Sequence, residues 1–429
     1  MTRTRIVLVA FLAVFLAGCG STSTSAPVAS GLPAAGASNE PSTPPTSDEP
    51  SSPGPTGSQP SIAPLDWEPV PDQPASSETQ LTSVVWTGTR FVAAGVLASG
   101  EAVFVDSTDG MTWNLQLPLG AGAEIHDLAA TPAGVLAVGD ITVGSTGSDA
   151  ASWFSKDGLA WTAASGGAAL APAAGRTIRM NGVTSTGTGW LAVGEEDTAC
   201  ELNCDTASAV RAVVWTSPDG LTWSRQPAAT SLAHAAMSAV VRLGSGFVAV
   251  GGAPDRVSTT QVPEHAVAWT STDGRSWSRV PDSALFHAPA GTDQTFGDTM
   301  SGIATDGKHL VAVGTVGTQG DVGSALAWTS ATGRTWQRGT ATDFLNGQLF
   351  SVAAVPGGFL GTGPSGTDSC LGGIWSTTDG ASWTCVATDS SIGGFAAYAA
   401  AASSTVMIVV GLPTPDVSIQ SSIWTRPTP

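Results

Sequence analysis

The feature that most constrains this chain is an internal repeat. From residue 81 onward, an apolar strand, a polar turn and a second strand ending in glycine recur, as in LTSVVWTGTRFVAAG (81–95) and MSAVVRLGSGFVAVG (237–251). Seven copies occur, and they end at Gly95, Gly139, Gly194, Gly251, Gly314, Gly363 and Gly411. The glycines lie 44 to 63 residues apart. A strand repeat of this length predicts an all-β fold, a seven-bladed β-propeller of four-stranded antiparallel blades.

A hairpin forms the second half of each unit, for example AWTSTDGRSWSRVP (268–281). Six copies are present, and the seventh unit stops after Trp424-Thr425, one strand short of a blade. The missing strand is available near the N-terminus, because WEPVP (67–71) matches WSRVP (277–281). We therefore expect an N-terminal strand to complete the last blade, which removes the open sheet edges.

Tryptophan occupies two fixed positions of the repeat. One position holds Trp67, Trp113, Trp161, Trp223, Trp277, Trp336 and Trp383. The other holds Trp153, Trp215, Trp269, Trp328, Trp375 and Trp424, with Phe104 in the remaining unit. Thirteen of the 15 tryptophans are therefore predicted to belong to the framework.

The hairpin turn has its own pattern. Ser271-Thr272-Asp273-Gly274 fits a type I turn with a left-handed glycine at its fourth position, and this register predicts Trp269 directly opposite Trp277. One copy has Thr332 in place of the aspartate but keeps Gly333. The turn carboxylates are Asp109, Asp157, Asp219, Asp273 and Asp379. A carboxylate repeated at one turn position is predicted to cap the backbone and not to catalyse.

This Ser-x-Asp-Gly-x-x-Trp pattern resembles the Asp-box, or BNR repeat, of sialidase-like propellers, whose motif is one residue longer. The resemblance covers residues 65 to 425 and implies the fold. Sialidases also use three arginines, a Tyr/Glu pair, an acid/base Asp and a Phe/Tyr-Arg-Ile-Pro motif. That motif is missing, and the only tyrosine, Tyr398, has no evident Glu partner. No catalytic residue is assigned, and we expect a non-catalytic binding module for a protein, glycan or cell-wall component. A sialidase-like glycoside hydrolase is the alternative, and a scaffold for membrane-complex assembly is the second alternative.

The N-terminus predicts export. Arg3 and Arg5 precede an apolar run that is too short to span a bilayer, and the run ends in Leu16-Ala17-Gly18-Cys19. This ending resembles the lipobox of bacterial lipoproteins, which implies lipidation of Cys19 and an extracytoplasmic, membrane-anchored protein. An ordinary signal peptide with a chance cysteine is the alternative. The predicted parts are a leader (1–18), a disordered Ser/Thr/Pro-rich stalk (19–64) and the propeller (65–429).

Charge and cysteine content narrow the partners. The net charge of −18 repels phosphate backbones, which disfavours nucleic acid as a partner. The same charge repels anionic lipid, so we expect attachment to the membrane to depend on the lipid anchor. We expect a monomer. In an exported protein, two close cysteine pairs predict disulfides, Cys200 with Cys204 and Cys370 with Cys385. A four-thiolate metal site is the alternative, although its C-x-x-C spacing is missing.

We expect no cofactor and no metal. A calcium site is conceivable among the acidic loop residues, but the chain lacks a D-x-D-x-D-G loop. The histidines show no metal-ligand spacing; they are His126, His234, His265, His287 and His309.

Blade topology predicts where a ligand would bind. With the strands of a blade named A to D from the centre outward, the A–B and C–D turns share one face, which we call the turn face. The B–C loops and interblade connections share the other, the loop face, and they vary in length and sequence. Binding residues are usually found on variable loops above a rigid scaffold. The candidate contacts are Glu195, Glu196, Asp197, Asp255, Arg256, Glu264, His265, His287, Asp293, Asp298 and Trp190.

Overall fold

The computed structural model describes residues 67–71, 73–116, 118–144, 147–198, 210–254, 264–287, 296–317, 324–341, 344, 347–364, 370–387, 392, 395–413 and 421–428. All of them belong to the second of two compact units, residues 60–429. Cys19 and the predicted leader and stalk lie outside the described residues. Within the described part, no helix has the length and apolar character needed to cross a membrane.

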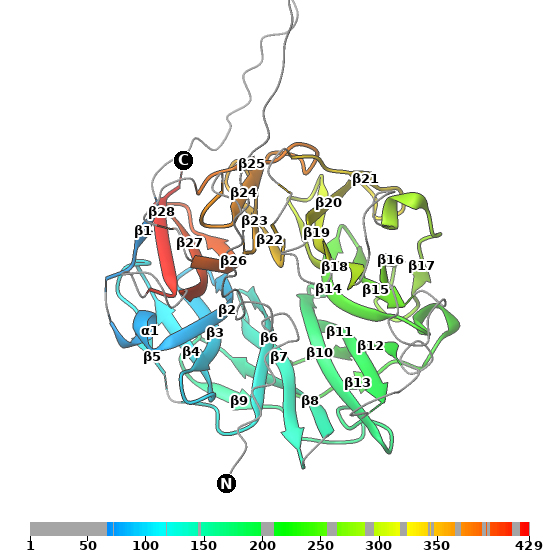
Figure 1. The fold of residues 1–429 in the computed structure, drawn as a ribbon. Helices are drawn as coiled ribbons and strands as arrows, with labels where there is room; N and C mark the ends of the chain where they lie inside the picture. The colour runs from blue at the N-terminus through cyan, green and yellow to red at the C-terminus, as the bar shows by residue number, and fades with distance from the viewer. Residues whose placement is uncertain are drawn as a thin grey trace, which may run out of the picture. The chain divides into compact units, whose positions relative to one another are not determined.

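The second unit is a seven-bladed β-propeller of four-stranded antiparallel sheets, as the repeat predicts (Figure 1). The A strands are β2 (Thr79–Trp86), β6 (Ala123–Thr131), β10 (Arg176–Ser185), β14 (Ala236–Leu243), β18 (Phe296–Thr305), β22 (Ser351–Val355) and β26 (Phe395–Ala402). The B strands are β3 (Phe91–Leu97), β7 (Gly134–Val143), β11 (Trp190–Thr198), β15 (Gly246–Pro254), β19 (Leu310–Gly317), β23 (Gly358–Thr362) and β27 (Val406–Pro413).

The outer half of each blade is a shorter hairpin. The C strands are β4 (Ala102–Ser107), β8 (Gly147–Ser155), β12 (Arg211–Ser217), β16 (Glu264–Ser271), β20 (Ser324–Ser330), β24 (Ile374–Thr377) and β28 (Ile423–Pro427). The D strands are β5 (Asn114–Leu115), β9 (Trp161–Ala163), β13 (Ser224–Arg225), β17 (Ser278–Arg279), β21 (Gln337–Arg338), β25 (Thr384–Cys385) and β1 (Glu68–Pro69). Short helical turns are α1 (Pro74–Ser77), η1 (Thr230–Leu232) and η2 (Ala284–Phe286).

The sheets are apolar on both faces because each one packs between two neighbours. In β3, Phe91 and Ala93 belong to the cluster shared with blade 7, whereas Val92 and Ala94 belong to the cluster shared with blade 2. This arrangement explains why the B strands consist of consecutive apolar residues instead of alternating with polar ones. The core is therefore divided among the interfaces between adjacent blades.

The ring closes where the ends of the described chain meet. β1 pairs with β28 through Glu68↔Thr425 and Pro69↔Trp424, so the predicted closure is confirmed. Trp67 is only 3% exposed, and its indole Nε1 donates a hydrogen bond to the carbonyl oxygen of Val386 in blade 6 at 3.2 Å.

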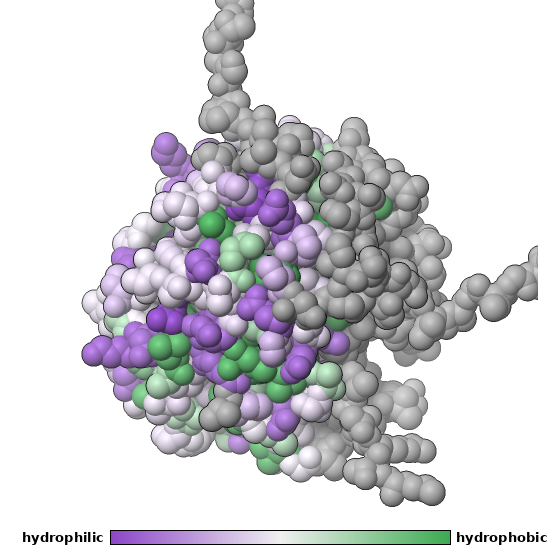
Figure 2. All heavy atoms as spheres, turned by 90° about the vertical axis from the view of Figure 1, so that its left-hand side faces the viewer, coloured by the Kyte–Doolittle hydropathy of each residue, from purple (hydrophilic) through white to green (hydrophobic). Residues whose placement is uncertain are grey.

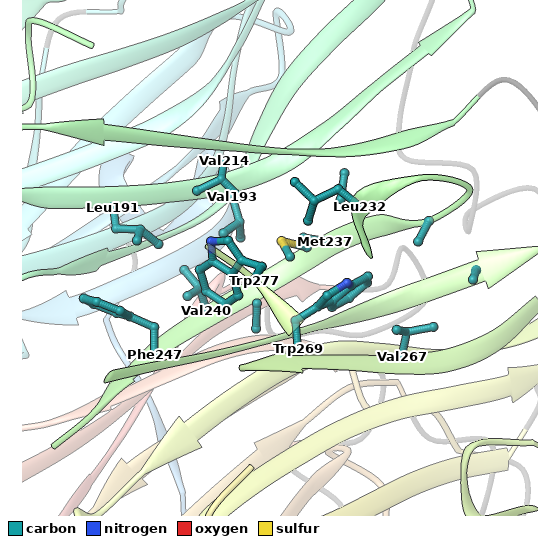
Figure 3. Close-up of a cluster of buried hydrophobic side chains, with 14 residues drawn as sticks. Leu191, Val193, Val214, Leu232, Met237, Val240, Phe247, Val267, Trp269 and Trp277 are labelled. Carbon is teal, nitrogen blue, oxygen red and sulfur yellow. The ribbon is translucent and has the colours of Figure 1, made fainter. Parts of the chain in front are cut away.

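One predicted register is wrong. Trp269 lies opposite Arg279, and the neighbouring pair is Thr270↔Ser278, so Trp277 falls in the turn instead of opposite Trp269. The turn is longer because Asp273 Oδ1 accepts hydrogen bonds from the N–H groups of Arg275 and Ser276 at 2.8 and 2.7 Å, which adds a second bend after Gly274. The two indoles still share one buried cluster between blades 3 and 4 (Figure 3).

The turn face repeats the same contacts from blade to blade. In blade 4 the Ser271 hydroxyl accepts a hydrogen bond from the N–H of Gly274 at 2.9 Å, and Gly274 has φ +70°. The N–H group donates to an equivalent Ser or Thr hydroxyl at Gly110, Gly158, Gly220, Gly333 and Gly380. The turn aspartates also cap the backbone, because the Oδ1 atoms of Asp109, Asp157, Asp219, Asp273 and Asp379 accept hydrogen bonds from N–H groups that follow the turn glycine.

A disulfide joins the C–D hairpin of blade 6. Cys370 and Cys385 are bonded as predicted, 15 residues apart. Cys385 lies opposite Trp375, whereas the equivalent positions opposite Trp269 and Trp328 hold Arg279 and Arg338. Both arginines lie over the tryptophan rings, at 5.9 and 5.2 Å. The disulfide therefore takes the place of a cation–π contact in blade 6.

The other predicted disulfide falls in the B–C connection of blade 3, between β11 and β12. Cys200 and Cys204 both lie outside the described residues, so the structure places neither sulfur atom. The bond between Cys200 and Cys204 therefore stays a prediction from the sequence, whereas the bond between Cys370 and Cys385 is confirmed.

Candidate functional site

The glycine that ends each B strand marks equivalent positions in all seven blades. A Cβ placed on Gly251 would lie 2.0 Å from the carbonyl oxygen of Ala236, which explains why the repeat requires glycine there. The other six glycines meet the carbonyls of Gln80, Glu124, Arg179, Thr299, Gln348 and Ala396 at 1.8 to 2.1 Å. The chain can therefore be aligned with itself at three positions of each blade: the carbonyl residue, the residue two further on, and the residue after the glycine.

The residue two positions after the carbonyl is a β-bulge in six of the A strands. The register skips Thr82, His126, Asn181, Ser238, Ser301 and Tyr398, and Phe350 is the equivalent in blade 6. Contacts between neighbouring blades join several of them. His126 Nδ1 lies 3.3 Å from Asn181 Oδ1, and the rings of Phe350 and Tyr398 are 5.3 Å apart. The bulges re-aim one side chain per blade, as bulges commonly do near binding sites.

Charged side chains occur at the aligned positions in only two blades, at all three positions in blade 2 and at two of the three in blade 3, where the bulge residue is Asn181. The five residues are Glu124, His126 and Asp140 in blade 2, and Arg179 and Glu195 in blade 3. We call these five residues the ionic cluster. The other blades hold Gln80, Thr82 and Val96; Ala236, Ser238 and Gly252; Thr299, Ser301 and Thr315; Gln348, Phe350 and Pro364; and Ala396, Tyr398 and Leu412. Because five blades fold without such charges, the framework does not require them.

His126 is the centre of the blade 2 part of the cluster. Its Nε2 lies 3.1 Å from Asp140 Oδ1 and 3.8 Å from Glu124 Oε2. The Asn181 Nδ2 donates to the carbonyl oxygen of Met237 at 3.0 Å, which orients the Asn181 Oδ1 toward His126 Nδ1. Both ring nitrogens therefore face acceptors, an arrangement that suits a doubly protonated imidazole.

The electrostatics agree with this geometry. Burial favours the neutral ring, but hydrogen bonds to Asp140 and Glu124 outweigh it and raise the pKa of His126 to about 9. Burial also raises the pKa of Glu195, although the nearby Arg179 opposes this shift. The ionic cluster thus combines three carboxyl groups with two cationic groups in a partly buried setting.

Arg179 and Glu195 form the blade 3 part of the cluster. They are paired residues of β10 and β11, and Arg179 Nε lies 3.2 Å from Glu195 Oε1. The Arg179 side chain is 39% exposed and the Glu195 side chain 19%. The guanidinium is therefore accessible to a ligand while it is held in place by a carboxylate.

Blades 2 and 3 are held together beneath the cluster. Asp127 Oδ2 accepts a hydrogen bond from the N–H of Val183 at 2.8 Å, and Asp127 Oδ1 accepts one from the N–H of Leu128 at 2.8 Å. Burial raises the pKa of Asp127 to about 7, even though these two N–H groups lower it. The contact fixes the separation of the two strands that carry the site.

Of the predicted contacts, Glu195 belongs to the cluster and Glu196 does not. Glu196 is fully buried and binds Arg176, Arg211 and Arg225 as well as the N–H of Ala173. Because Glu196 precedes and Arg211 follows the B–C loop of blade 3, this ion pair joins the base of that loop. The role of Glu196 is therefore structural, whereas Asp197 is half-buried beside it.

The other described candidates lie apart from the cluster. His265 and His287 stack with ring centroids 4.8 Å apart, and His287 Nε2 lies 2.9 Å from Asp282 Oδ1. The prediction that Trp190 contacts a ligand on the loop face is wrong. Trp190 pairs with Ser185 and Ser217 at the turn-face end of β11 and is 4% exposed, so it does not reach the loop face. Asp255, Arg256 and Asp293 lie outside the described residues, and only the backbone of Glu264 and Asp298 is described.

Four residues of the ionic cluster were not predicted, because we expected binding residues on long loops: Glu124, His126, Asp140 and Arg179. These four residues lie on strands, near the bulges, where we expected only framework. The signal was nevertheless present in the sequence, since aligning the seven units on their final glycines shows charged residues at the three aligned positions in units 2 and 3 alone.

Comparisons with known proteins concern the fold. No family model and no curated protein sequence matches the chain. Among solved structures, it is similar to the Trypanosoma rangeli sialidase at TM-score 0.46 and 14% identity, covering 74% of this chain and 56% of that one.

Two further solved structures resemble the chain. One is the α-L-arabinofuranosidase from Fusarium graminearum, at TM-score 0.43 and 14% identity, with 81% of this chain and 93% of that chain covered. The other is the virginiamycin B lyase from Staphylococcus aureus, at TM-score 0.47 and 10% identity, with 85% and 98% covered. At these identities and TM-scores, no activity of this chain follows from the likeness.

Proposed function

We propose that this chain is a lipid-anchored, extracytoplasmic binding protein that recognises its ligand at the ionic cluster on the loop face. The single observation that carries the proposal is the departure from the repeat. Charges occupy the aligned positions of blades 2 and 3 and of no other blade. Residues that the fold does not require, and that cost desolvation to bury, are the best candidates for recognition.

The cluster favours a ligand with groups of both signs. Arg179 can pair with a carboxylate, and the acids Glu124, Asp140 and Glu195 can accept hydrogen bonds from an amine or from hydroxyl groups. Peptide-bearing glycans of the cell wall offer all of these groups. The exposed Ile141 and Val143 on the same hairpin as Asp140 add apolar contact area.

A scaffold function has less support. Scaffolds usually present a broad apolar or charged patch. On the side of the propeller drawn in Figure 2, hydrophobic residues occur in small separate groups among polar ones. The exposed large hydrophobic residues of the described chain are Met111, Leu115, Ile141, Val143, Leu159 and Leu285.

Co-sedimentation of the purified protein with isolated peptidoglycan, followed by a glycan array, tests the proposal. We expect Arg179→Ala to reduce binding at least tenfold. Arg242→Ala is the matched control, because Arg242 lies on the turn face and donates to the carbonyl oxygen of Gly244. Equal binding by both variants, or no binding by the unmodified protein, would reject the ionic cluster as the recognition site.

The lipid anchor has a separate test. Cys19→Ser should release the protein from the membrane without changing its binding to peptidoglycan, because the lipidated residue precedes the propeller. Membrane fractionation of cells that produce each form measures the release. Retention of the Cys19→Ser variant in the membrane fraction would contradict lipidation.

A glycoside hydrolase is the second candidate. Such enzymes pair an ionised carboxylate with a carboxylic acid of raised pKa, about 5–10 Å apart. Burial raises the pKa of Glu195, and Glu124 and Asp140 supply two further carboxyl groups in the same cluster. Release of reducing sugar from glycans, lost in Glu195→Gln, would replace the binding proposal with this one.

A further inference from the structure

Three side chains of the ionic cluster have the geometry of metal ligands. The ligand atoms of Glu124, His126 and Asp140 all lie within 4.8 Å of one another. Ligands about 2.0–2.2 Å from a tetrahedral ion lie roughly 3.3–3.6 Å apart, and His126 Nε2 is already 3.1 Å from Asp140 Oδ1. The Glu124 carboxylate is 3.8 Å from the same nitrogen, and its side chain is 35% exposed, so it can move closer. We propose that these three residues bind a divalent transition-metal ion such as Zn²⁺.

The residue behind His126 supports this assignment. Histidine ligands usually donate their second N–H to a fixed acceptor, which orients the ring and selects the tautomer. Asn181 Oδ1 lies 3.3 Å from His126 Nδ1, and the carbonyl oxygen of Met237 fixes the amide by accepting from Asn181 Nδ2. His126 Nδ1–H can therefore donate to Asn181 while Nε2 offers its lone pair to the ion. The ion takes the place of the Nε2 proton, which leaves to solvent.

The backbone holds the donors in place before any ion arrives. Glu124 and Asp140 are directly paired across β6 and β7, and His126 occupies the bulge that follows the next pair, Ile125↔Gly139. The carbonyl of Glu124 is packed against Gly139, and Asp127 joins the bulge to blade 3. Binding would therefore need little reorganisation, which favours affinity.

The donor set selects among ions. One imidazole nitrogen with two carboxylates suits Zn²⁺ and other first-row transition ions, whereas Ca²⁺ prefers six to eight oxygen ligands. Three protein ligands also leave a coordination position open. Arg179 and Glu195 lie in the same cluster, so a ligand held there could complete the coordination of the ion. This last step deepens the proposed function and rests on it, whereas ion binding can be tested alone.

The experiment is calorimetric titration of the purified, chelator-treated full-length protein with Zn²⁺, with Ca²⁺ in parallel and no other ligand present. We expect one equivalent of Zn²⁺ to bind and Ca²⁺ to bind at least tenfold more weakly. His126→Gln and Asp140→Asn should each weaken Zn²⁺ binding at least tenfold. Asn181→Ala, which removes no ligand, should weaken it about tenfold or more.

His309→Gln is the matched control, because His309 also pairs with an aspartate, Asp306, but on the turn face. It should leave Zn²⁺ binding unchanged. Thermal unfolding of each variant shows that the fold is intact. No stoichiometric Zn²⁺ binding, or equal loss in His309→Gln and His126→Gln, overturns the metal site.

Repeating peptidoglycan co-sedimentation with and without Zn²⁺ separates the two proposals. Zn²⁺ binding without peptidoglycan binding rejects the proposed function alone, and peptidoglycan binding without Zn²⁺ binding rejects the metal site alone.

Discussion

The two faces of the propeller are formed by the same blades but follow different rules. On the turn face, the glycine N–H donates to a Ser or Thr hydroxyl in six hairpins. In five of them the tryptophan indole also donates to the carbonyl of that glycine. On the loop face the close contact of glycine with a carbonyl and the bulge beside it repeat, but the side chains around them differ from blade to blade. The comparison teaches that repetition marks residues needed for the fold, whereas departure from it marks residues available for binding.

The largest effect on stability is expected where the repeat is strictest. Gly251→Ala would place a Cβ 2.0 Å from the carbonyl oxygen of Ala236, which forces the β14–β15 ladder apart. We expect a loss of about 3 kcal/mol in the free energy of unfolding, measured by denaturant titration. Gly166→Ala is the control, because nothing lies within 4 Å of its Cβ position. Similar losses for both variants would contradict the steric explanation of the repeated glycine.

A smaller effect is expected at the turn aspartates. Asp273→Ala removes the acceptor for the N–H groups of Arg275 and Ser276 and should cost about 1 kcal/mol. Thr332→Asp restores the aspartate in the one copy that lacks it, where Thr332 Oγ1 accepts only from Arg334 N–H at 3.3 Å, and should stabilise by roughly 0.5 kcal/mol. Denaturant titration measures both changes. If Thr332→Asp destabilises the protein, the turns are less equivalent than their geometry indicates.

The same bonds predict acid sensitivity. The N–H groups of Ser276 and Arg275 hold the pKa of Asp273 below its ordinary value. The folded state therefore binds the proton less readily than the unfolded chain. The resulting stability is present above about pH 4, the unfolded pKa, and is lost as the pH falls through the folded pKa. The difference in melting temperature between the unmodified protein and Asp273→Asn should therefore shrink at acid pH. A difference that stays constant with pH would contradict the stabilising role of the Asp273 carboxylate.

The smallest effect on stability is expected in the ionic cluster. Arg179→Ala removes one partly exposed ion pair and should change the free energy of unfolding by less than about 1 kcal/mol. Its effect on ligand binding should be far greater, as described above. A large loss of stability in this variant would place Arg179 in the framework and erase the contrast between the two faces.

The sequence carried most of the fold because the fold is repetitive. Blade number, the closure by Trp67 and Trp424, and the aspartate caps all follow from residues that recur. The Trp269 register was not predictable from turn type alone, because it depends on how many N–H groups Asp273 accepts.

The candidate site was less predictable because its contacts cross strands and blades. Glu196 was predicted to contact the ligand. Its burial was not predicted, because it depends on three arginines from different strands, which spacing does not show. His126 was dismissed as isolated because its partners Asp140 and Asn181 come from another strand and another blade.

The closure of the ring has a mechanical consequence. Any force applied to the chain before Trp67 acts first on the seam between β1 and β28, which contains only two residue pairs. The hydrogen bond from Trp67 to Val386 passes part of that load to blade 6, and the Arg426 guanidinium, 5.4 Å from the centre of the Trp67 ring, adds resistance within blade 7. Tension on the N-terminal segment is therefore shared between two blades through a single tryptophan.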